Sequence, residues 1–395
     1  MEIISPGMGN LTRRKVLQQS LLAGGFCLSG LDNRIPFGLF AAQSAGRNRD
    51  QSFLGVVPFS GEGNPPMGEP IGTELDGRLF TDLSAVTPDV RVTPTEQFFI
   101  RTLASKLLDT TRWDIQIGGL VNKAMTVPVE ALTKKARYMG AHLMECSGNP
   151  RAAHFGMLSV AEWDGVPLQE ILERANSQPS GARVLVSGFD RYQDQSMTSV
   201  PGASWIFSQD QLVSSRAFLA TTMNGQRLSV DHGAPVRLVV PGWYGCVSIK
   251  WVNQINFVAE AAPATSQMRE YAGRTLQRGV PSLARDYQPA TIGSAAMPVR
   301  IEKWRIDGNI RYQITGIRWG PGSSAMCEIR FGPEEEFIPV DRVETVDDAW
   351  SFWTYEWKPK RRGEFTIRLR LKGEKLDNRK LDSGYYDRSL EIAEI

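Results

Sequence analysis

The residue with the clearest chemical potential is a cysteine at the end of a predicted strand. Cys146 opens a loop rich in Gly, Asn and Pro, and the guanidinium of Arg151 follows within that loop. A nearby positive charge favours the thiolate, which can act as a nucleophile or as one ligand to a soft transition metal. Because no second cysteine lies near it in sequence, a CxxC redox pair and a zinc knuckle do not fit. Spacing alone favours a buried structural cysteine.

A second cluster offers cations and backbone amides. Asp231, His232 and Arg237 surround a Gly/Pro turn, and a glycine loop then leads to the segment 248–250, which ends in Lys250. Two cations, a histidine and the N–H groups of glycine loops suit a phosphate. Taken alone, a solvated turn with a snorkelling lysine is the simpler interpretation. The sequence contains no G-x-S-x-G elbow, P-loop or G-x-G-x-x-G fingerprint.

The elements that must position these residues are a mixture of strands and short helices. Apolar and polar residues alternate over 113–117, which predicts a half-buried strand. Helices are predicted at 129–136 and 166–175. Further strands are predicted at 98–100, 141–144, 184–188, 217–222 and 237–241. This mixture indicates an α+β core.

After about residue 285 the pattern changes to short strands separated by Gly, Pro and charged turns. Such strands are predicted at 313–317, 325–331, 352–357 and 365–372. Their regular spacing is typical of an antiparallel β-sandwich. Residues 47–90 are predicted to be an extended segment that leads into the core, called the lead-in below. Residues 262–288 are predicted to be a linker. The expected organisation is a signal region at 1–45, a core domain at 46–284 and a sandwich domain at 285–395.

Composition excludes several classes of protein. The 395 residues include 45 Lys and Arg against 43 Asp and Glu, a balance that argues against nucleic-acid binding. With 42% hydrophobic and 22% charged residues the chain is globular rather than disordered. Four cysteines are too few for a disulfide scaffold, and three histidines argue against a multi-histidine metal centre. Cys246 and Cys327 are expected to be core residues.

The N-terminus carries the pattern of an export signal. Arg13 and Arg14 precede an apolar, glycine-bearing stretch at 16–31, and small residues follow at 41–45. The twin-arginine route carries folded proteins, so it suits an enzyme that is loaded with a cofactor before export. The apolar run is too short and too rich in glycine for a secure membrane span. A weak signal anchor or a chance arginine pair is the alternative; we expect a periplasmic protein.

A family resemblance rests on several segments in order. The run 145–151, followed by 162–168, resembles the molybdenum-cysteine signature of the sulfite oxidase family. The segments 98–101, 113–118, 223–225, 231–237 and 241–251 follow the same family's pattern. The resemblance covers roughly residues 90–260, and the C-terminal part resembles the family's dimerisation domain. It implies an α+β sulfite-oxidase-like molybdopterin domain followed by an immunoglobulin-like antiparallel β-sandwich, with a possible homodimer through the latter.

The resemblance implies a molybdenum-molybdopterin cofactor with Cys146 as the protein ligand to the metal. Arg151 matches an anion-contacting arginine near the metal, and Arg101 is a candidate to share that role. Two guanidinium groups suit an oxyanion such as sulfite, because each can bind it through two hydrogen bonds. The other positions that match cofactor-contacting residues are Phe99, Ile100, Arg101, Thr102, Leu103, Asp190, His232, Arg237, Ser248, Ile249 and Lys250.

Three departures from the family's pattern bear on the substrate. Pro201 stands where sulfite-oxidising members carry a tyrosine, and Thr102-Leu103 replace a histidine that often follows the first arginine. The stretch between Cys146 and the segment 162–168 is also short. Tyr192 or Tyr244 could supply the missing phenol, although a structural role is favoured for both.

The resulting expectation is an exported oxidoreductase that transfers an oxygen atom on a small anionic sulfur compound such as sulfite. Since the sequence has no C-x-x-C-H haem motif, the electrons are expected to pass to a separate acceptor, a c-type cytochrome by analogy with the family. One alternative is a reductase or dehydrogenase for an S-oxide or N-oxide on the same cofactor. A non-catalytic periplasmic binding or assembly protein is the other.

Overall fold

The computed structural model describes residues 51–395, apart from positions 91, 197–198, 323–324, 344–348 and 374. The predicted signal region, with Arg13 and Arg14, lies outside these described residues, so export stays a prediction. In the described part of the chain, no helix is long and apolar enough to cross a membrane.

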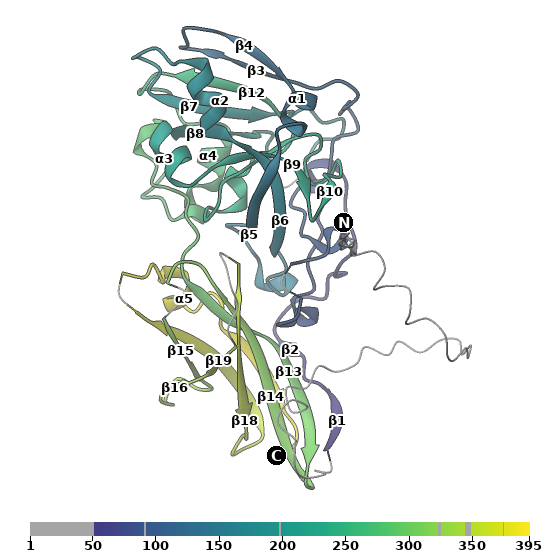
Figure 1. Ribbon diagram of the computed structural model, residues 1–395. Helices are drawn as coiled ribbons and strands as arrows, with labels where there is room; N and C mark the ends of the chain where they lie inside the picture. Colours follow the sequence, from purple (N-terminus) through teal and green to yellow (C-terminus); the bar gives the residue numbers. More distant parts are fainter. Residues whose placement is uncertain (1–50, 91, 197–198, 323–324, 344–348, 374) are drawn as a thin grey trace, which may run out of the picture. The chain divides into compact units, whose positions relative to one another are not determined.

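The first sheet carries the half-buried strand that the sequence predicts (Figure 1). Its order is β4 (Met125–Pro128), β3 (Asp114–Gly119), β12 (Val252–Val258), β7 (Arg183–Gly188) and β8 (Ser204–Ser208). Strand β12 is parallel to β3, and the other neighbours are antiparallel. Ile115 and Ile117 of β3 are buried while Asp114 and Gln116 are exposed, which confirms the predicted alternation. Helix α2 (Leu168–Ala175), also predicted, buries its apolar face in the same core.

The second sheet delivers the reactive cysteine. Its order is β10 (Gln226–Arg227), β9 (Phe218–Met223), β6 (Leu158–Pro167) and β5 (Arg137–Glu145), with β11 (Arg237–Val239) also paired to β9. Strand β5 ends at Glu145, so Cys146 is the first residue of the loop that follows. The predicted strand at 98–100 is buried, but it forms only an isolated bridge between Leu79 and Ile100. It is an extended segment rather than a strand because no further residues pair with it.

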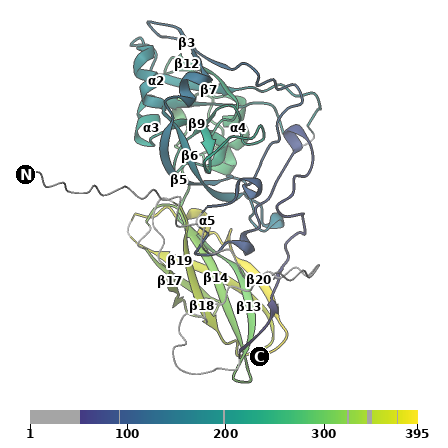
Figure 2. The same cartoon turned by 45° about the vertical axis from the view of Figure 1, so that its right-hand side comes forward.

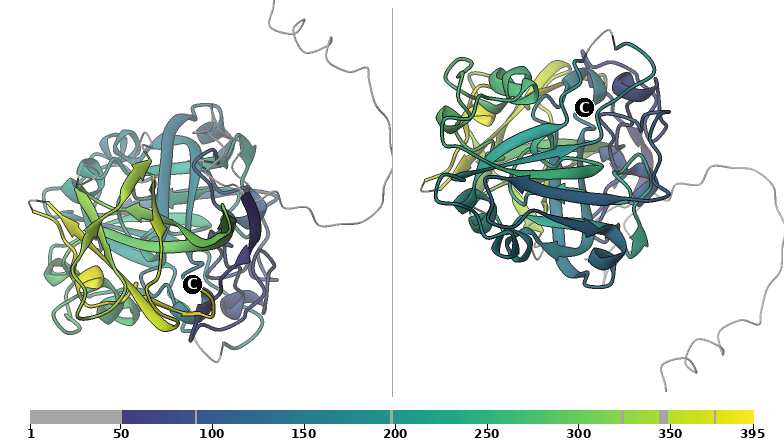
Figure 3. Two further views of the ribbon diagram at one scale, coloured as in Figure 1. Left: turned by 90° about the horizontal axis from the view of Figure 1, so that it is seen from below. Right: turned by 90° about the horizontal axis from the view of Figure 1, so that it is seen from above.

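The C-terminal residues form two further antiparallel sheets, which Figure 2 and Figure 3 show as green to yellow arrows. One has the order β1 (Gln51–Val56), β13 (Ala295–Ile306), β14 (Asn309–Trp319), β18 (Ser351–Trp357) and β17 (Asp341–Val343). The other has the order β16 (Ile338–Pro339), β15 (Met326–Arg330), β19 (Gly363–Lys372), β20 (Arg388–Ile392) and β2 (Phe59–Ser60). Both sheets contribute to one hydrophobic cluster, which also takes in Leu143, Phe155 and Tyr244. The immunoglobulin-like classification and the boundary near 285 stay predictions.

The predicted lead-in at 47–90 is not merely extended chain. Strand β1 pairs with β13, and β2 pairs with β20, so this segment adds one strand to each C-terminal sheet. Local sequence could not reveal these pairs because the partners lie hundreds of positions away. Residues 51–60 of the lead-in therefore belong structurally with the last third of the chain, whereas Leu79 pairs with Ile100.

The predicted linker at 262–288 is wrong for most of its length. It carries helix α4 (Ser266–Tyr271) and a 3-10 helix at Ala272–Thr275, and it buries Met268 and Tyr271. Both side chains belong to the core that contains β3 and β12. The frequent Gly, Pro and Arg residues reflect short turns against this core rather than a free connection.

Candidate functional site

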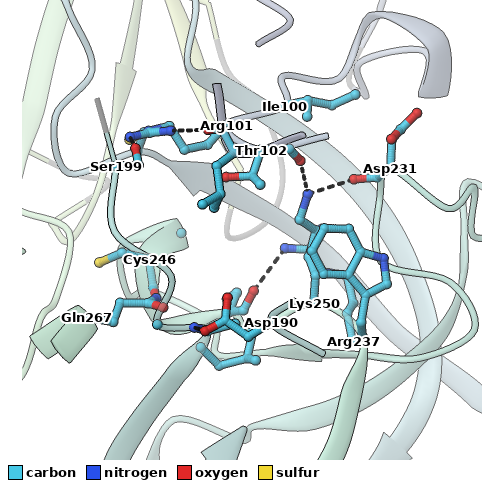
Figure 4. A pocket seen from close by; sticks show the side chains of 18 of the residues that line it. Ile100, Arg101, Thr102, Asp190, Ser199, Asp231, Arg237, Cys246, Lys250 and Gln267 are labelled. Carbon is cyan, nitrogen blue, oxygen red and sulfur yellow. Dashed lines mark hydrogen bonds between the residues drawn. The ribbon is translucent and has the colours of Figure 1, made fainter. Parts of the chain in front are cut away.

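A cavity brings most of the predicted site residues together (Figure 4). The space between its walls, including the open mouth, is about 920 Å³. Its walls come from the 98–102 segment, the end of β5, the 245–251 segment and helix α4. The predicted residues that line it are Phe99, Ile100, Arg101, Thr102, Cys146, Asp190, His232, Arg237, Ser248, Ile249 and Lys250.

The backbone of Cys146 is fixed on both sides. Its N–H donates to the carbonyl of Met157 at 3.0 Å, and its carbonyl accepts from the N–H of Asn149 at 3.0 Å. The thiol is 5% exposed, and burial raises its pKa, while the N–H of Gly148 and the charge of Arg101 act in the opposite direction. A thiolate in this place therefore needs a further positive charge, such as a metal ion.

Two cations, the buried Arg237 and the half-buried Lys250, form the basic wall of the cavity. Figure 4 shows the ammonium of Lys250 aimed at the carbonyls of Thr102 and Asp231, and its Nζ lies 2.8 Å from the latter. Arg237 donates to the carbonyls of His232 at 3.0 Å and Ser248 at 3.2 Å, whereas its buried Nε has no partner. Burial lowers the pKa of Lys250 far below its usual value and that of Arg237 to about 10.

Among the described residues neither of these cations has a carboxylate within ion-pair distance. A buried charge without a counter-ion costs several kcal/mol. The wall therefore fits an anionic group on a ligand, which would supply the missing negative charge.

His232 is neutral in this wall. Its Nε2 lies 2.9 Å from the carbonyl oxygen of Thr95, so this nitrogen carries the proton and donates. Burial, together with the charges of Arg237 and Lys250, lowers the pKa of His232 to about 4. Its ring packs edge-on against Phe98 at 5.6 Å, which fixes its orientation.

Asp190 shows the opposite shift. Its Oδ2 accepts the N–H of Ala203 at 3.0 Å, and burial raises the pKa of the carboxyl to about 6. Tyr192 also lines the cavity, and burial next to Asp190 raises its pKa beyond the usual range of a phenol. The phenol is therefore a hydrogen-bond donor at neutral pH.

The helix α4 region supplies residues that the sequence analysis did not select. Gln267, Glu270 and Tyr271 line the cavity, and the Tyr271 ring packs 5.1 Å from the guanidinium of Arg274. The charges of Arg101 and Arg274 both act on the thiol of Cys146. Arg101 itself donates to Ser199 Oγ at 2.8 Å. No local motif distinguishes Gln267, Glu270 and Tyr271 in the sequence. They line the cavity because helix α4 packs into the core.

Two predicted site residues lie elsewhere. Arg151 is exposed, and its guanidinium donates to the carbonyls of Gly384 and Tyr385, each at 3.3 Å. Leu103 packs over Gly77, where an added Cβ would lie 2.4 Å from its Cγ. Neither is among the residues that line the cavity.

The other candidates divide between the cavity and the core. Tyr244 is buried outside the cavity beneath the ammonium of Lys380, at 4.4 Å. Cys327 is a core residue as expected. Cys246 differs from expectation: it is half-buried on the cavity wall, with its Sγ 3.8 Å from Ser147 Oγ. Burial raises its pKa to about 12, so it stays a thiol.

Comparison with known proteins gives this site a context. Residues 102–266 match the family model described as the oxidoreductase molybdopterin binding domain. Human mitochondrial sulfite oxidase is 30% identical over 198 residues, which are 46% of this chain and 36% of that protein. The chain therefore carries a molybdopterin-binding oxidoreductase domain that is similar to part of the sulfite oxidases. A nitrate reductase [NADPH] of Beauveria bassiana is 28% identical over 181 residues, 42% of this chain and 20% of that protein. The chain thus spans well under two thirds of these curated relatives.

The fold of this chain also has a solved counterpart. The sulfane dehydrogenase SoxCD from Paracoccus pantotrophus superposes with a TM-score of 0.58 at 18% identity, covering 93% of this chain and 89% of that one. Its likeness extends over both the cavity-bearing sheets and the C-terminal sheets.

The residues present fit a molybdopterin cofactor. Lys250 and Arg237 provide a positive wall that has no counter-ion among the described residues, as an anionic phosphate requires. Cys146 provides one buried sulfur ligand at the same cavity, and among the described residues no cluster of three His, Cys, Asp or Glu offers another metal site. A thiolate is a suitable ligand for a soft transition metal.

Proposed function

We propose that this chain is an exported molybdenum-cofactor oxidoreductase that acts on a small anionic sulfur compound such as sulfite. The observation that carries the proposal is the cavity that combines one buried thiol, Cys146, with the guanidinium of Arg101 and with the cations Arg237 and Lys250. When bound, the cofactor supplies oxygen-atom transfer coupled to two-electron redox chemistry.

The residues at the cavity then have separate roles in binding the cofactor and the substrate. Cys146 binds the metal, and Lys250 and Arg237 bind the phosphate of the cofactor through charge-assisted hydrogen bonds. His232, neutral at physiological pH, donates to Thr95 and so positions the segment before Phe99 without adding another charge. Arg101 and Arg274 attract the anionic substrate, because both guanidinium groups act electrostatically at Cys146.

The electron acceptor, the oligomeric state and the cellular location are also part of the proposal. A separate acceptor, of the c-type cytochrome class, would take the electrons one at a time, and the C-terminal sheets would provide a homodimer interface. The periplasm is the proposed location because a twin-arginine route accepts a folded, cofactor-loaded protein. These points rest on the family resemblance and the N-terminal sequence.

The test begins with elemental analysis. Mature protein is purified from a molybdenum-replete host and analysed by mass spectrometry for molybdenum, with an endogenous molybdoenzyme from the same cells as the loading control. Stoichiometric molybdenum supports the proposal, and its absence from this protein alone overturns it. Loaded protein is then assayed with sulfite, thiosulfate and S-oxides using an artificial acceptor or donor. Turnover of a neutral S-oxide but of no anion would favour the reductase alternative.

A further inference from the structure

The loop that carries Cys146 is held from its far side by residues near the end of the chain. The ammonium of Lys380, in helix α5 (Arg379–Asp382), donates to the carbonyl of Ser147 at 2.8 Å. The Tyr385 hydroxyl donates to the carbonyl of Asn149. These contacts join positions more than two hundred residues apart, so the loop's conformation depends on the C-terminal sheets.

Glu145, directly before Cys146, accepts a hydrogen bond at each of its two carboxylate oxygens. The Glu145 side chain is fully buried, its Oε1 accepts from the Tyr386 hydroxyl at 2.7 Å, and its Oε2 accepts from Trp319 Nε1 at 2.9 Å. Both oxygens therefore have a donor, one from strand β14 and one from the turn before β20. Burying a carboxylate is expensive unless it is hydrogen-bonded in this way.

The donors are themselves fixed by packing. The ammonium of Lys380 lies 4.4 Å from the centre of the Tyr244 ring and 5.1 Å from that of Tyr385. Tyr386 packs edge-on against Trp319 at 5.1 Å and against Tyr385 at 5.0 Å. These side chains can therefore hold the loop in one geometry, because moving any of them would disturb its neighbours.

We propose that Trp319, Lys380, Tyr385 and Tyr386 form a C-terminal clamp that orients Cys146 for metal binding. None of the four lines the cavity, so each is a positioning residue that acts through the loop at 145–149. The clamp contacts positions 145, 147 and 149, while the backbone of Cys146 is bound to Met157 and Asn149. The C-terminal sheets thus complete the metal site from outside it. The inference rests on the proposed role of Cys146.

The experiment measures the mobility of Cys146 without any metal. Full-length apoprotein from a host that cannot make molybdopterin is pulsed with iodoacetamide, and mass spectrometry of peptides gives separate alkylation rates for Cys146 and Cys327. The test variants are Tyr386→Phe and Lys380→Met. The matched controls are Tyr312→Phe, which removes a hydroxyl bonded to the carbonyl of Glu394, and Lys303→Met, which removes an ammonium paired with the Glu394 carboxylate.

We expect each test variant to raise the Cys146 rate roughly tenfold, because one hydrogen bond that involves a charged group is lost. The Cys327 rate should stay unchanged, and the controls should alter neither rate. An unchanged Cys146 rate overturns the proposal, and so does an equal rise at Cys327, which would report general loosening. If Tyr386→Phe fails to fold, Lys380→Met still decides, because it leaves both hydrogen bonds of Glu145 in place.

In protein that loads molybdenum, Lys380→Met should lower kcat with KM unchanged, since Arg101 and Arg274 are not part of the clamp. A change confined to KM would overturn the positioning role. The two proposals fail separately: absent molybdenum removes the proposed function but leaves the alkylation result standing.

Discussion

The side chain of Arg274 runs alongside Gly148, where an added Cβ would lie 3.1 Å from Arg274 Cδ and 3.5 Å from its Nε. This contact places a guanidinium beside the loop of Cys146, and that guanidinium is only loosely paired with Glu270, at 4.0 Å. Arg151, within the same loop, instead donates to backbone carbonyls near residue 385. We therefore propose Arg274 as the second anion-binding cation beside Arg101: like Arg151 it does not line the cavity, but its charge acts on Cys146.

Arg274→Gln should raise the KM for sulfite by roughly tenfold or more, because a charge-assisted contact to the substrate is lost. Arg151→Gln is the matched control and should change KM much less, since its guanidinium serves the protein backbone. Steady-state kinetics at constant ionic strength with an artificial acceptor measure both. A larger rise in KM for Arg151→Gln than for Arg274→Gln would show that Arg151 binds the anionic substrate.

Cys146→Ser should abolish turnover and strongly reduce bound molybdenum while leaving the fold intact. A serine hydroxyl is a poor ligand for a soft metal, and the exchange removes only one buried sulfur atom. Cys246→Ser, on the wall of the same cavity, is the control and should retain both molybdenum and activity. Elemental analysis and circular dichroism give the readouts. Wild-type molybdenum in the Cys146→Ser protein would contradict the ligand assignment.

Lys250→Gln should weaken retention of the cofactor roughly tenfold or more, because glutamine keeps one hydrogen-bond donor but loses the charge that a phosphate needs. Pterin fluorescence and molybdenum content after gel filtration measure retention. Lys303→Gln, on a C-terminal strand, is the control for removal of a lysine charge. If both variants retained the cofactor equally well, the phosphate site would lie elsewhere.

Local patterns were sufficient for elements whose burial alternates along the chain. The strand at β3 and the helix at α2 follow directly from the periodicity of their apolar residues. Strand β13 is not predicted from the sequence, because its first five residues are all buried and show no alternation. Strands β1 and β2 exist only through partners near residues 302–306 and 389–390.

Some residues of the candidate site could likewise be predicted from the sequence, and others could not. Cys146, Arg237 and Lys250 stand in recognisable segments, and the cavity brings them together. Tyr271 and Arg274 could not be found, because their segment resembles a turn-rich connection and only core packing turns it toward Cys146. The hydrogen bonds from Lys380 and Tyr386 to the loop at 145–149 are likewise tertiary contacts that no local sequence pattern predicts.

Two groups in the cavity give the apoprotein opposite dependences of stability on pH. His232 has its pKa lowered from 6.5 to about 4, so between these values the unfolded chain binds the proton that the folded chain does not. The free energy of unfolding therefore falls as pH drops through this window, by about 3 kcal/mol in total. Asp190 has its pKa raised from 3.8 to about 6, so the folded chain binds the extra proton and stability falls as pH rises.

The histidine should dominate, because Asp190 is only partly buried and solvent screening reduces its contribution to about 1 kcal/mol. His232→Gln should remove the loss of stability between pH 6.5 and 4 relative to the wild type, and Asp190→Asn should make that loss steeper. Urea unfolding of the apoproteins at several pH values, followed by tryptophan fluorescence, measures both differences. A His232→Gln protein whose stability parallels the wild type across the whole window would show that His232 titrates normally and is not held neutral by burial.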